Sequence, residues 1–253
     1  MTNAENEFGR RFEGRRIYIT GAASGIGLAT ARLLAREGAQ LALADIAEQA
    51  LQAAADEIGA TAFAVDLTDG DAIDRSVVAA AKALGGLDGV INCAGVGDGT
   101  KLDALDPERW RRVMAINLDA PYRVCRAALP FLQAADRATI VNIASGEALL
   151  PGSGGAPVYA ASKGGLLALT RALAAGLAPK IRVNAVCPGV TDTPMTAGVL
   201  HSSEISTSFL AKYALGRAAD PIEIAEAIAF LASHASSYVT GITLAADGGR
   251  SFH

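Results

Sequence analysis

The sequence predicts a doubly wound α/β fold, in which helices cover both faces of one parallel sheet. Short apolar runs alternate with Ala-rich stretches of crossover length, as such a sheet requires. A glycine-rich turn follows the first run, and 253 residues suit one domain. The seven expected strands are residues 17–20, 41–45, 61–65, 89–92, 139–143, 181–186 and 242–245. We expect a single domain over residues 14–253, preceded by a flexible arm over residues 1–13.

Helix signals fall between these strands. Residues 26–37 are dense in Ala and Leu, and Gly38 behind them suits a left-handed helix end. Asp106 and Asp220 each precede a proline, the pattern of an N-cap followed by Pro at the first helical position. Further helices are expected over residues 119–132 and 159–177. Residues 188–208 are rich in Thr, Ser and Gly and are expected to form a lid.

Composition excludes several classes of function. Hydrophobic residues make up 51% of the chain, yet polar or charged residues interrupt every apolar run before membrane-span length. The polar start of the chain has no apolar segment typical of a secretion signal, so we expect a cytoplasmic protein. The net charge is −4 and the longest basic group is Arg109, Arg111 and Arg112, which we interpret as a solvated helix face without affinity for nucleic acid.

The three cysteines predict neither a metal site nor a disulfide framework. Cys93, Cys125 and Cys187 form no CxxC pair and have no His at ligand spacing. We expect buried, reduced thiols.

The glycine turn predicts a nucleotide site. Gly21, Gly25 and Gly27 lie between a strand and a helix, where backbone N–H groups and the helix dipole can face a pyrophosphate. Their spacing differs from GxGxxG, and a plain tight turn is the alternative.

Asp45 favours NAD over NADP. It ends the second strand, where a carboxylate can bind the adenosine ribose hydroxyls and repel a 2′-phosphate. Ser24, Ile46 and Ala47 supply no Arg or Lys to accept that phosphate. The alternative for Asp45 is a carboxylate that caps the next loop.

Two further strand ends support this site. Asp66 follows the third strand, where it can meet the adenine, and the small residues of Asn92-Cys93-Ala94-Gly95 end the fourth. Each alone is compatible with an ordinary turn. Because ligands of open α/β sheets bind at the carboxyl ends of strands, their agreement predicts a dinucleotide site.

Tyr159 and Lys163 predict acid–base chemistry beside that site. They are four residues apart in an expected helix and so share one face. A nearby ammonium favours the phenolate, so we expect the pKa of Tyr159 to be lowered toward working pH. Taken singly, an exposed tyrosine and a surface lysine are the alternatives. Asn117 and Ser145 likewise have structural alternatives, a helix-distorting amide and a strand-end residue.

These motifs together resemble the short-chain dehydrogenase/reductase family in its compact form. The similar segments are Thr20 to Gly27 for TGxxxGIG, Asn92 to Gly95 for NNAG, Asn117 in Ala-Ile-Asn-Leu, Ser145 after Val-Asn-Ile-Ala, Tyr159-Ala-Ala-Ser-Lys163 and Pro188-Gly189. Cys93 departs from the pattern, because it replaces the second Asn of NNAG. The resemblance covers residues 14–249 and implies a Rossmann-type domain and a homo-oligomer, a tetramer or a dimer.

The resemblance also implies roles for individual residues. Lys163 would bind the nicotinamide ribose, Ser145 would hold the substrate oxygen, and Asn117 would support a proton-relaying water. Ser153 is a weaker alternative for the serine. Thr193 and Val190 would hold the carboxamide group of the nicotinamide. The complete cofactor set is Gly21, Ser24, Gly25, Ile26, Gly27, Asp45, Ile46, Asp66, Leu67, Asn92, Ala94, Gly95, Tyr159, Lys163, Pro188, Gly189, Val190 and Thr193.

The predicted activity is NAD-dependent hydride transfer between nicotinamide and a secondary alcohol or ketone. The expected substrate contacts are Ser145, Glu147, Leu149, Met195 and Phe209. Because they are mostly apolar, we expect a medium-sized, mainly hydrophobic substrate, with cyclic, aryl and amino alcohols as candidates. The alternatives are a 3-ketoacyl carrier or CoA-type reductase, a nucleotide-sugar epimerase or dehydratase, and a catalytically silent NAD-binding protein. A 3-ketoacyl reductase would favour NADPH, against which Asp45 argues. An epimerase or dehydratase is typically a longer chain with a GxxGxxG phosphate loop. A silent NAD-binding protein would not need the intact set of Asn117, Ser145, Tyr159 and Lys163.

Overall fold

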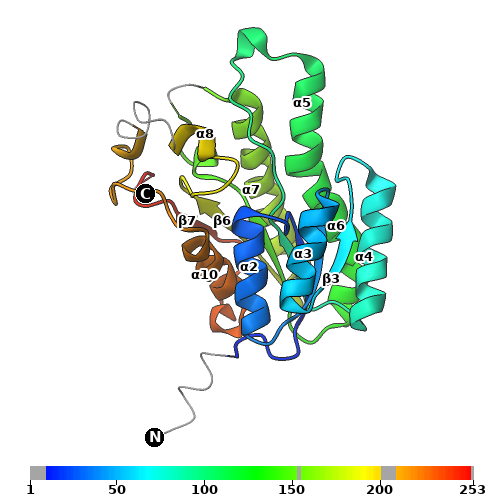
Figure 1. Cartoon of the computed structure of the whole chain (residues 1–253). Helices are drawn as coiled ribbons and strands as arrows, with labels where there is room; N and C mark the ends of the chain where they lie inside the picture. The colour runs from blue at the N-terminus through cyan, green and yellow to red at the C-terminus, as the bar shows by residue number, and fades with distance from the viewer. Residues whose placement is uncertain (1–9, 153–154, 201–208, 252–253) are drawn as a thin grey trace, which may run out of the picture.

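The computed structural model describes residues 10–152, 155–200 and 209–251. Its seven strands form one parallel sheet in the order β3-β2-β1-β4-β5-β6-β7 (Figure 1). The strands are β1 (Arg16–Thr20), β2 (Gln40–Asp45), β3 (Thr61–Ala64), β4 (Gly89–Asn92), β5 (Ala138–Ile143), β6 (Ile181–Pro188) and β7 (Thr243–Ala246). The predicted doubly wound sheet is confirmed.

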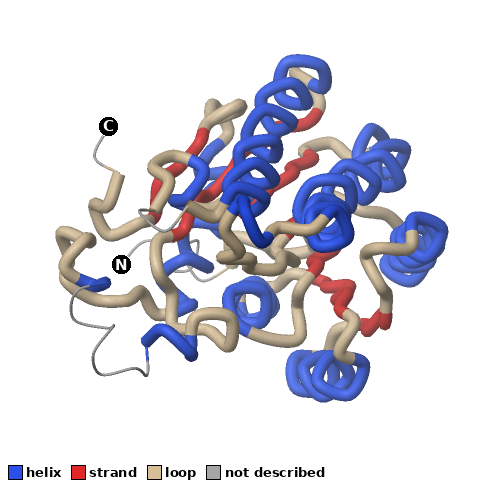
Figure 2. The backbone as a smooth tube through the Cα atoms, turned by 90° about the horizontal axis from the view of Figure 1, so that it is seen from above, coloured by secondary structure: helices blue, strands red, loops and turns tan. Residues whose placement is uncertain are grey.

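Helices cover both faces of the sheet, as the view from above shows (Figure 2). They are α2 (Gly25–Arg36), α3 (Glu48–Ile58), α4 (Gly70–Leu84), α5 (Pro107–Met114), α6 (Ala120–Ala134), α7 (Pro157–Leu177), α8 (Ala197–Leu200) and α10 (Pro221–Ala232). A π-helical turn, η2 (Ala115–Asp119), joins α5 to α6. Short 3-10 turns are η1 (Leu102–Ala104), η3 (Gly146–Ala148) and η4 (His234–Ser236).

Alternation along β1 divides the core into two layers. Ile17 and Ile19 pack with α2, α3 and α10, while Tyr18 points to the other side, among α4, α6 and α7. The Tyr18 hydroxyl lies 2.8 Å from Ser76 Oγ of α4, so this buried phenol has a hydrogen-bond partner. Successive side chains of a strand face opposite ways, and both faces are therefore buried.

The expected helix ends are confirmed. Asp106 accepts a hydrogen bond from the Arg109 amide at 2.8 Å, and Asp220 forms a capping box with Glu223. Gly38 follows α2 with a φ of +94°, a conformation that L side chains rarely adopt.

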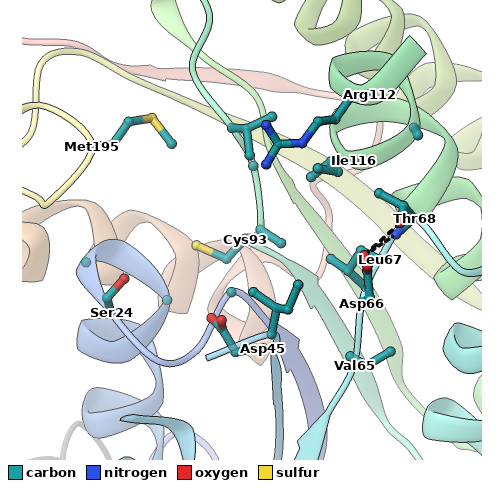
Figure 3. A pocket seen from close by; sticks show the side chains of 18 of the residues that line it. Ser24, Asp45, Val65, Asp66, Leu67, Thr68, Cys93, Arg112, Ile116 and Met195 are labelled. Carbon is teal, nitrogen blue, oxygen red and sulfur yellow. Dashed lines mark hydrogen bonds between the residues drawn. The ribbon is translucent and has the colours of Figure 1, made fainter. Parts of the chain in front are cut away.

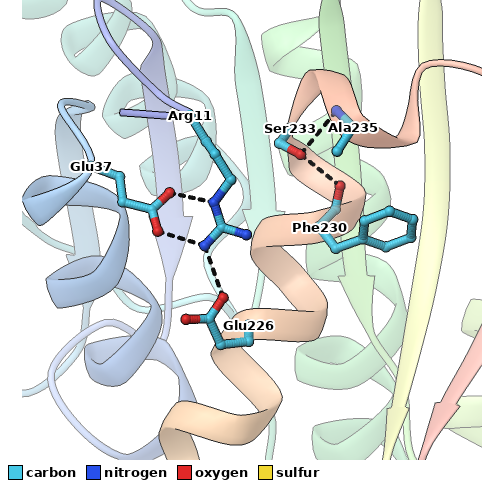
Figure 4. A network of polar contacts seen from close by, with 6 residues as sticks. All are labelled: Arg11, Glu37, Glu226, Phe230, Ser233 and Ala235. Atoms are coloured by element: carbon cyan, nitrogen blue, oxygen red, sulfur yellow. Dashed lines mark hydrogen bonds and ion pairs between the residues drawn. The ribbon is translucent and has the colours of Figure 1, made fainter. Parts of the chain in front are cut away.

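The folded domain begins before residue 14, so the expected arm is too long. Phe12 is fully buried in the core beneath α2 and α10. Arg11 donates from Nε to Glu37 at 2.6 Å and from Nη2 to Glu226 at 2.8 Å (Figure 4). Because Phe12 is flanked by charged residues on both sides, the sequence pattern does not indicate that its side chain is buried.

The sheet order changes direction between β1 and β4. From β1 the chain builds outward to β2 and β3, and from β4 it builds the other way to β7. A crevice forms at such a switch point, beyond the carboxyl ends of the strands. None of the helices in the described part of the chain is long and apolar enough to cross a membrane.

Candidate active site

The glycine turn lies directly against the end of β4. Gly21 has a φ of +69°, and a Cβ built on it would lie only 2.7 Å from the Ala94 nitrogen. A Cβ on Gly27 would collide with the Gly21 carbonyl oxygen. Thr20 Oγ1 accepts hydrogen bonds from the amides of Cys93 and Ala94, both at 3.2 Å. Only glycine permits this approach, and it leaves the N-terminus of α2 open to a ligand.

A cavity of about 750 Å³ opens at this turn (Figure 3). Its wall brings together the predicted cofactor residues Gly21, Ser24, Gly25, Ile26, Gly27, Asp45, Ile46, Asp66, Leu67, Ala94, Gly95 and Thr193. Four strand ends and the segment after β6 therefore meet at one site, as their positions in the sequence predicted.

Asp45 links the glycine turn to the end of β2. Its Oδ2 accepts the Ala23 amide at 3.1 Å, and its Oδ1 accepts the Ala47 amide at 3.0 Å. The second bond is the local capping contact that was the alternative reading of this residue. Both bonds hold the carboxylate at the cavity wall, so capping and ligand binding are compatible.

Asp66 is also held in place as an anion. The amide and hydroxyl of Thr68 both donate to its Oδ1 at 2.8 Å. These hydrogen bonds, together with the charge of Arg112, lower the pKa of Asp66.

The sequence interpretation missed one wall of the cavity. Glu108, Arg111, Arg112, Ala115 and Ile116 line it from α5 and η2. Figure 3 shows the Arg112 side chain extending toward the centre of the cavity. The three arginines are exposed, as expected, and Arg111 and Arg112 also border the cavity. The five lining residues recur at i, i+3, i+4, i+7 and i+8, the spacing of one helix face. This spacing in the sequence indicates that the five residues share one side of a helix.

Six predicted cofactor residues lie outside this wall: Tyr159 and Lys163 of α7, and four residues at the ends of β4 and β6. Asn92 is buried, and its Nδ2 donates to Asn142 Oδ1 at 2.8 Å, which ties β4 to β5. Pro188 ends β6, while Gly189 and Val190 line a second cavity of about 480 Å³. None of these residues lines the first cavity, so their assignment as cofactor contacts stays a prediction.

Lys163 and Asn117 meet at the edge of the cavity, beside Gly95. A Cβ built on Gly95 would lie 3.2 Å from Lys163 Nζ and 3.3 Å from Asn117 Oδ1. Lys163 is 3% exposed and donates to the Ile143 carbonyl oxygen at 2.8 Å. The ammonium is thus anchored at the end of β5 and faces the loop after β4.

The π-helical turn η2 positions Asn117. This amide accepts from the Val96 nitrogen at 2.9 Å and donates to the Val96 oxygen at 3.0 Å and to Ser162 Oγ at 3.1 Å. Ser162 Oγ in turn donates to the Tyr159 carbonyl oxygen at 2.8 Å. The turn, a frequent feature of functional sites, therefore clamps the β4 loop to the start of α7. Asn117 is both the helix-distorting amide and a member of the site.

The expected lowering of the Tyr159 pKa is wrong for this structure. Burial raises that pKa, a hydrogen bond with Ser145 opposes the rise, and the Glu147 carboxylate adds to it. The groups that act on this pKa do not include the Lys163 ammonium, whose Nζ donates to the Ile143 carbonyl oxygen. Burial in turn lowers the pKa of Lys163 to about 8.

The expected substrate contacts divide into separate environments. Met195 lines the first cavity, whereas Leu149 packs against the buried cluster that contains Leu166. Phe209 lies with its ring centroid 5.8 Å from that of Tyr213. Ser153, the weaker serine candidate, and residues 201–208 of the expected lid lie outside the described residues.

Glu147 is engaged within the chain. Its Oε1 lies 2.9 Å from Arg250 Nη2, and its Oε2 accepts the Gly152 amide at 2.6 Å. Both oxygens that a substrate amine would need already have partners. Across the described residues, no group of three or more His, Cys, Asp or Glu side chains is arranged to hold a metal ion.

The cavity fits a nicotinamide dinucleotide. The glycine turn has no side chain that would block a pyrophosphate, and the anionic Asp45 and Asp66 lie toward the β2 and β3 end. Lys163 and Asn117 approach the cavity at Gly95. These residues would hold the two ends of the cofactor.

Comparisons with known proteins agree with this geometry. A family model described as "Enoyl-(Acyl carrier protein) reductase" matches residues 21–251. The chain is 42% identical over 247 residues to cis-4-hydroxycyclohexanecarboxylate dehydrogenase of Sinomonas cyclohexanicum, covering 95% of this chain and 98% of the relative.

Solved structures from Brucella melitensis are also similar. One is described as "Short-chain dehydrogenase/reductase SDR:Glucose/ribitol dehydrogenase", with 36% identity, a TM-score of 0.90 and coverage of 95% of this chain and 98% of that one. Another is a 3-ketoacyl-(acyl-carrier-protein) reductase complexed with NADH, with 34% identity, a TM-score of 0.88 and coverage of 95% and 99%. The chain therefore belongs to the short-chain dehydrogenase/reductase family, whose chemistry rests on a nicotinamide cofactor.

Proposed function

We propose that this protein is an NAD-dependent oxidoreductase that interconverts a secondary alcohol and its ketone. The observation that carries the proposal is the meeting of Lys163 and Asn117 at Gly95, on the wall of the dinucleotide-sized cavity. Tyr159, one helical turn before Lys163, shares a hydrogen bond with Ser145. The relatives named as dehydrogenases support the same reaction class.

In this proposal each residue has one task. Ser145 holds the substrate oxygen, and Tyr159 exchanges the proton on that oxygen. Lys163 binds the nicotinamide ribose, and Asn117 keeps the β4 loop and α7 in register. When bound, the nicotinamide supplies the acceptor or donor of hydride at its C4.

The raised pKa of Tyr159 sets the direction of the pH dependence. Ketone reduction needs the phenol as a proton donor, so it proceeds at neutral pH. Alcohol oxidation needs the phenolate as a base and therefore accelerates as the pH rises toward the tyrosine pKa.

Asp45 supports NAD as the cofactor. Its carboxylate is fixed by the amides of Ala23 and Ala47, at the cavity wall beside Ile46. A 2′-phosphate placed there would face an anion, whereas ribose hydroxyls can donate to it.

The substrate is proposed to be a medium-sized, mainly hydrophobic secondary alcohol or ketone. Met195 is 55% exposed at the cavity wall and offers a flexible apolar contact. The Sinomonas relative is named as a dehydrogenase of a hydroxycyclohexanecarboxylate, which supports cyclic secondary alcohols as the first candidates to test.

We further propose a cytoplasmic homo-oligomer, a tetramer or a dimer. Several aromatic side chains are exposed, namely Trp110, Tyr122, Phe230 and Tyr238. Contact between subunits would remove such surface from water.

A second candidate is reduction of a 3-ketoacyl thioester. The similarity to the Brucella 3-ketoacyl reductase favours it. Acetoacetyl-CoA included among the test substrates separates the two candidates.

The test combines a cofactor choice with a substrate panel. Purified protein is incubated with NAD or NADP and cyclic, aryl, aliphatic or amino alcohols. In the reverse direction it is incubated with NADH or NADPH and the matching ketones or acetoacetyl-CoA, and the absorbance of reduced nicotinamide is followed in both. Turnover with NAD that is lost in Tyr159→Phe supports the proposal. A clear preference for NADP overturns the argument from Asp45, and undiminished turnover by Tyr159→Phe overturns the catalytic assignment. NAD binding without turnover of any alcohol or ketone would favour a silent binding protein.

A further inference from the structure

The C-terminal segment reaches back to the catalytic serine through a charged contact. Arg250 follows β7, and its Nη2 lies 2.9 Å from Oε1 of Glu147, which follows β5. The side chain of Arg250 is only 9% exposed and that of Glu147 is 28% exposed. The pair is therefore shielded from water far more than a surface ion pair.

Two neighbours fix the guanidinium in this place. Its central carbon lies 6.0 Å from the centroid of the Tyr213 ring, within range of a cation–π contact. Gly146 is the second neighbour, since a Cβ built on it would lie 3.5 Å from Arg250 Nη1, an ordinary van der Waals distance.

Glu147 connects this contact to Ser145. Its amide donates to Ser145 Oγ at 3.1 Å, and its Oε2 accepts the Gly152 amide at 2.6 Å. Glu147 thus braces both ends of residues 145–152, Ser145 through its backbone amide and Gly152 through its carboxylate, and Arg250 is the charged partner of that carboxylate.

We propose that Arg250 is a positioning residue for Ser145 and Tyr159: it fixes the Glu147 carboxylate and neutralises that charge beside the phenol. This inference rests on the proposed function, because it concerns the proton exchanged by Tyr159. It assigns a role in the reaction to the C-terminal segment, which the sequence analysis left without one.

Electrostatics make this role measurable. The titratable and charged groups around the phenol and the neighbouring thiol are Glu147, Cys187, Lys163, Asp247 and Arg171. Glu147 already raises the pKa of Tyr159. Without Arg250, its carboxylate would lack a cationic partner in a partly buried place, and its effect on the phenol would grow.

The experiment compares three variants with the wild type. Arg250→Met removes the guanidinium, Arg250→Lys keeps a positive charge, and the double variant Arg250→Met with Glu147→Gln removes both charges. The pH profile of kcat/KM is measured for the panel alcohol that the wild type oxidises fastest. In parallel, tyrosinate absorbance is titrated for each protein against the same protein carrying Tyr159→Phe, which isolates the titration of Tyr159.

In Arg250→Met the basic limb and the tyrosinate titration should move upward by about 1 pH unit, with a loss of about tenfold in oxidation at neutral pH. Arg250→Lys should lie between this variant and the wild type. The double variant should return to the wild-type pKa or fall below it, because the carboxylate that raises this pKa is gone as well. An unchanged pKa in Arg250→Met, or no return in the double variant, overturns the inference.

Failure of the proposed function gives a different result. If the wild type turns over no alcohol or ketone, the reaction assignment fails, while the tyrosinate titrations still decide whether Arg250 controls the phenol. If the wild type is active and Tyr159→Phe is not, the function stands whatever Arg250→Met shows.

Discussion

Replacing Lys163 with Met should abolish activity and yet stabilise the cofactor-free protein at neutral pH. Lys163 is 3% exposed, and burial lowers its pKa from 10.5 to about 8. That difference disfavours the buried ammonium by about 3 kcal/mol. Loss of the 2.8 Å bond to the Ile143 carbonyl offsets about 2 kcal/mol of the gain. Because Met fills a similar volume, the net gain in the free energy of unfolding should be about 1 kcal/mol.

The pH dependence of this gain has a definite sign. Below pH 8 the lysine is protonated in both the folded and the unfolded state, so the penalty is fully present. Between pH 8 and 10.5 the folded lysine loses its proton first, and the stability of the wild type rises with pH. Above 10.5 both states are neutral. The advantage of Lys163→Met should therefore be constant below pH 8 and reverse between pH 8 and 10.5, because the burial penalty is then gone while the loss of the hydrogen bond remains.

Urea unfolding followed by circular dichroism at one protein concentration measures this. Lys180→Met, at an exposed lysine after α7, is the matched control and should change stability little at any pH. The reasoning is refuted if Lys163→Met is less stable than the wild type at pH 7, or if its advantage is the same at pH 7 and above pH 10.5.

Substitutions at three other positions, with their controls, test the rest of the site. Asp45→Arg should raise the ratio of kcat/KM for NADP to that for NAD by about tenfold or more, because a cation replaces the anion facing the ribose; retained NAD preference would contradict this. Gly21→Ala should lower the free energy of unfolding by about 1–3 kcal/mol more than Gly59→Ala in urea unfolding, since both glycines have a φ of +69° but only Gly21 faces a backbone within 4 Å. Equal losses would show that the close approach is unimportant. Asn117→Ala should lower the free energy of unfolding by about 2 kcal/mol and lower kcat, because the amide and carbonyl of Val96 lose their partner. Asn117→Asp should restore only the hydrogen bond from the Val96 amide. An unchanged kcat in Asn117→Ala would refute the role of Asn117 in holding the β4 loop against α7.

The sheet could be predicted because its signals are local. A parallel strand buried on both faces needs a continuous apolar run, and the segments around Ile17 and Ile140 show this directly. The caps at Asp106 and Asp220 were equally local. The glycine turn and the strand-end carboxylates could be placed at one site because parallel strands end at the same edge.

The errors concern contacts between distant segments. Phe12 belongs to the core, and Arg11 pairs with Glu37 and Glu226, because α2 and α10 meet there, which no local pattern indicates. The pKa of Tyr159 depends on its burial and on Glu147, and the spacing to Lys163 shows neither.

Two other contacts were missed for related reasons. The spacing of Arg112 did indicate a shared helix face, but not that this face borders the cavity. The pairing of Glu147 with Arg250 joins the ends of two strands that are not neighbours in the sheet.

The most direct test of the central claim follows the hydrogen atom itself. A secondary alcohol carrying deuterium on its carbinol carbon is incubated with NAD and either the wild type or Tyr159→Phe, and the reduced nicotinamide is examined by NMR. We predict deuterium at C4 of the nicotinamide with the wild type and almost none with the variant. Ketone formation without deuterium in the nicotinamide, or equal transfer by the variant, would contradict the account.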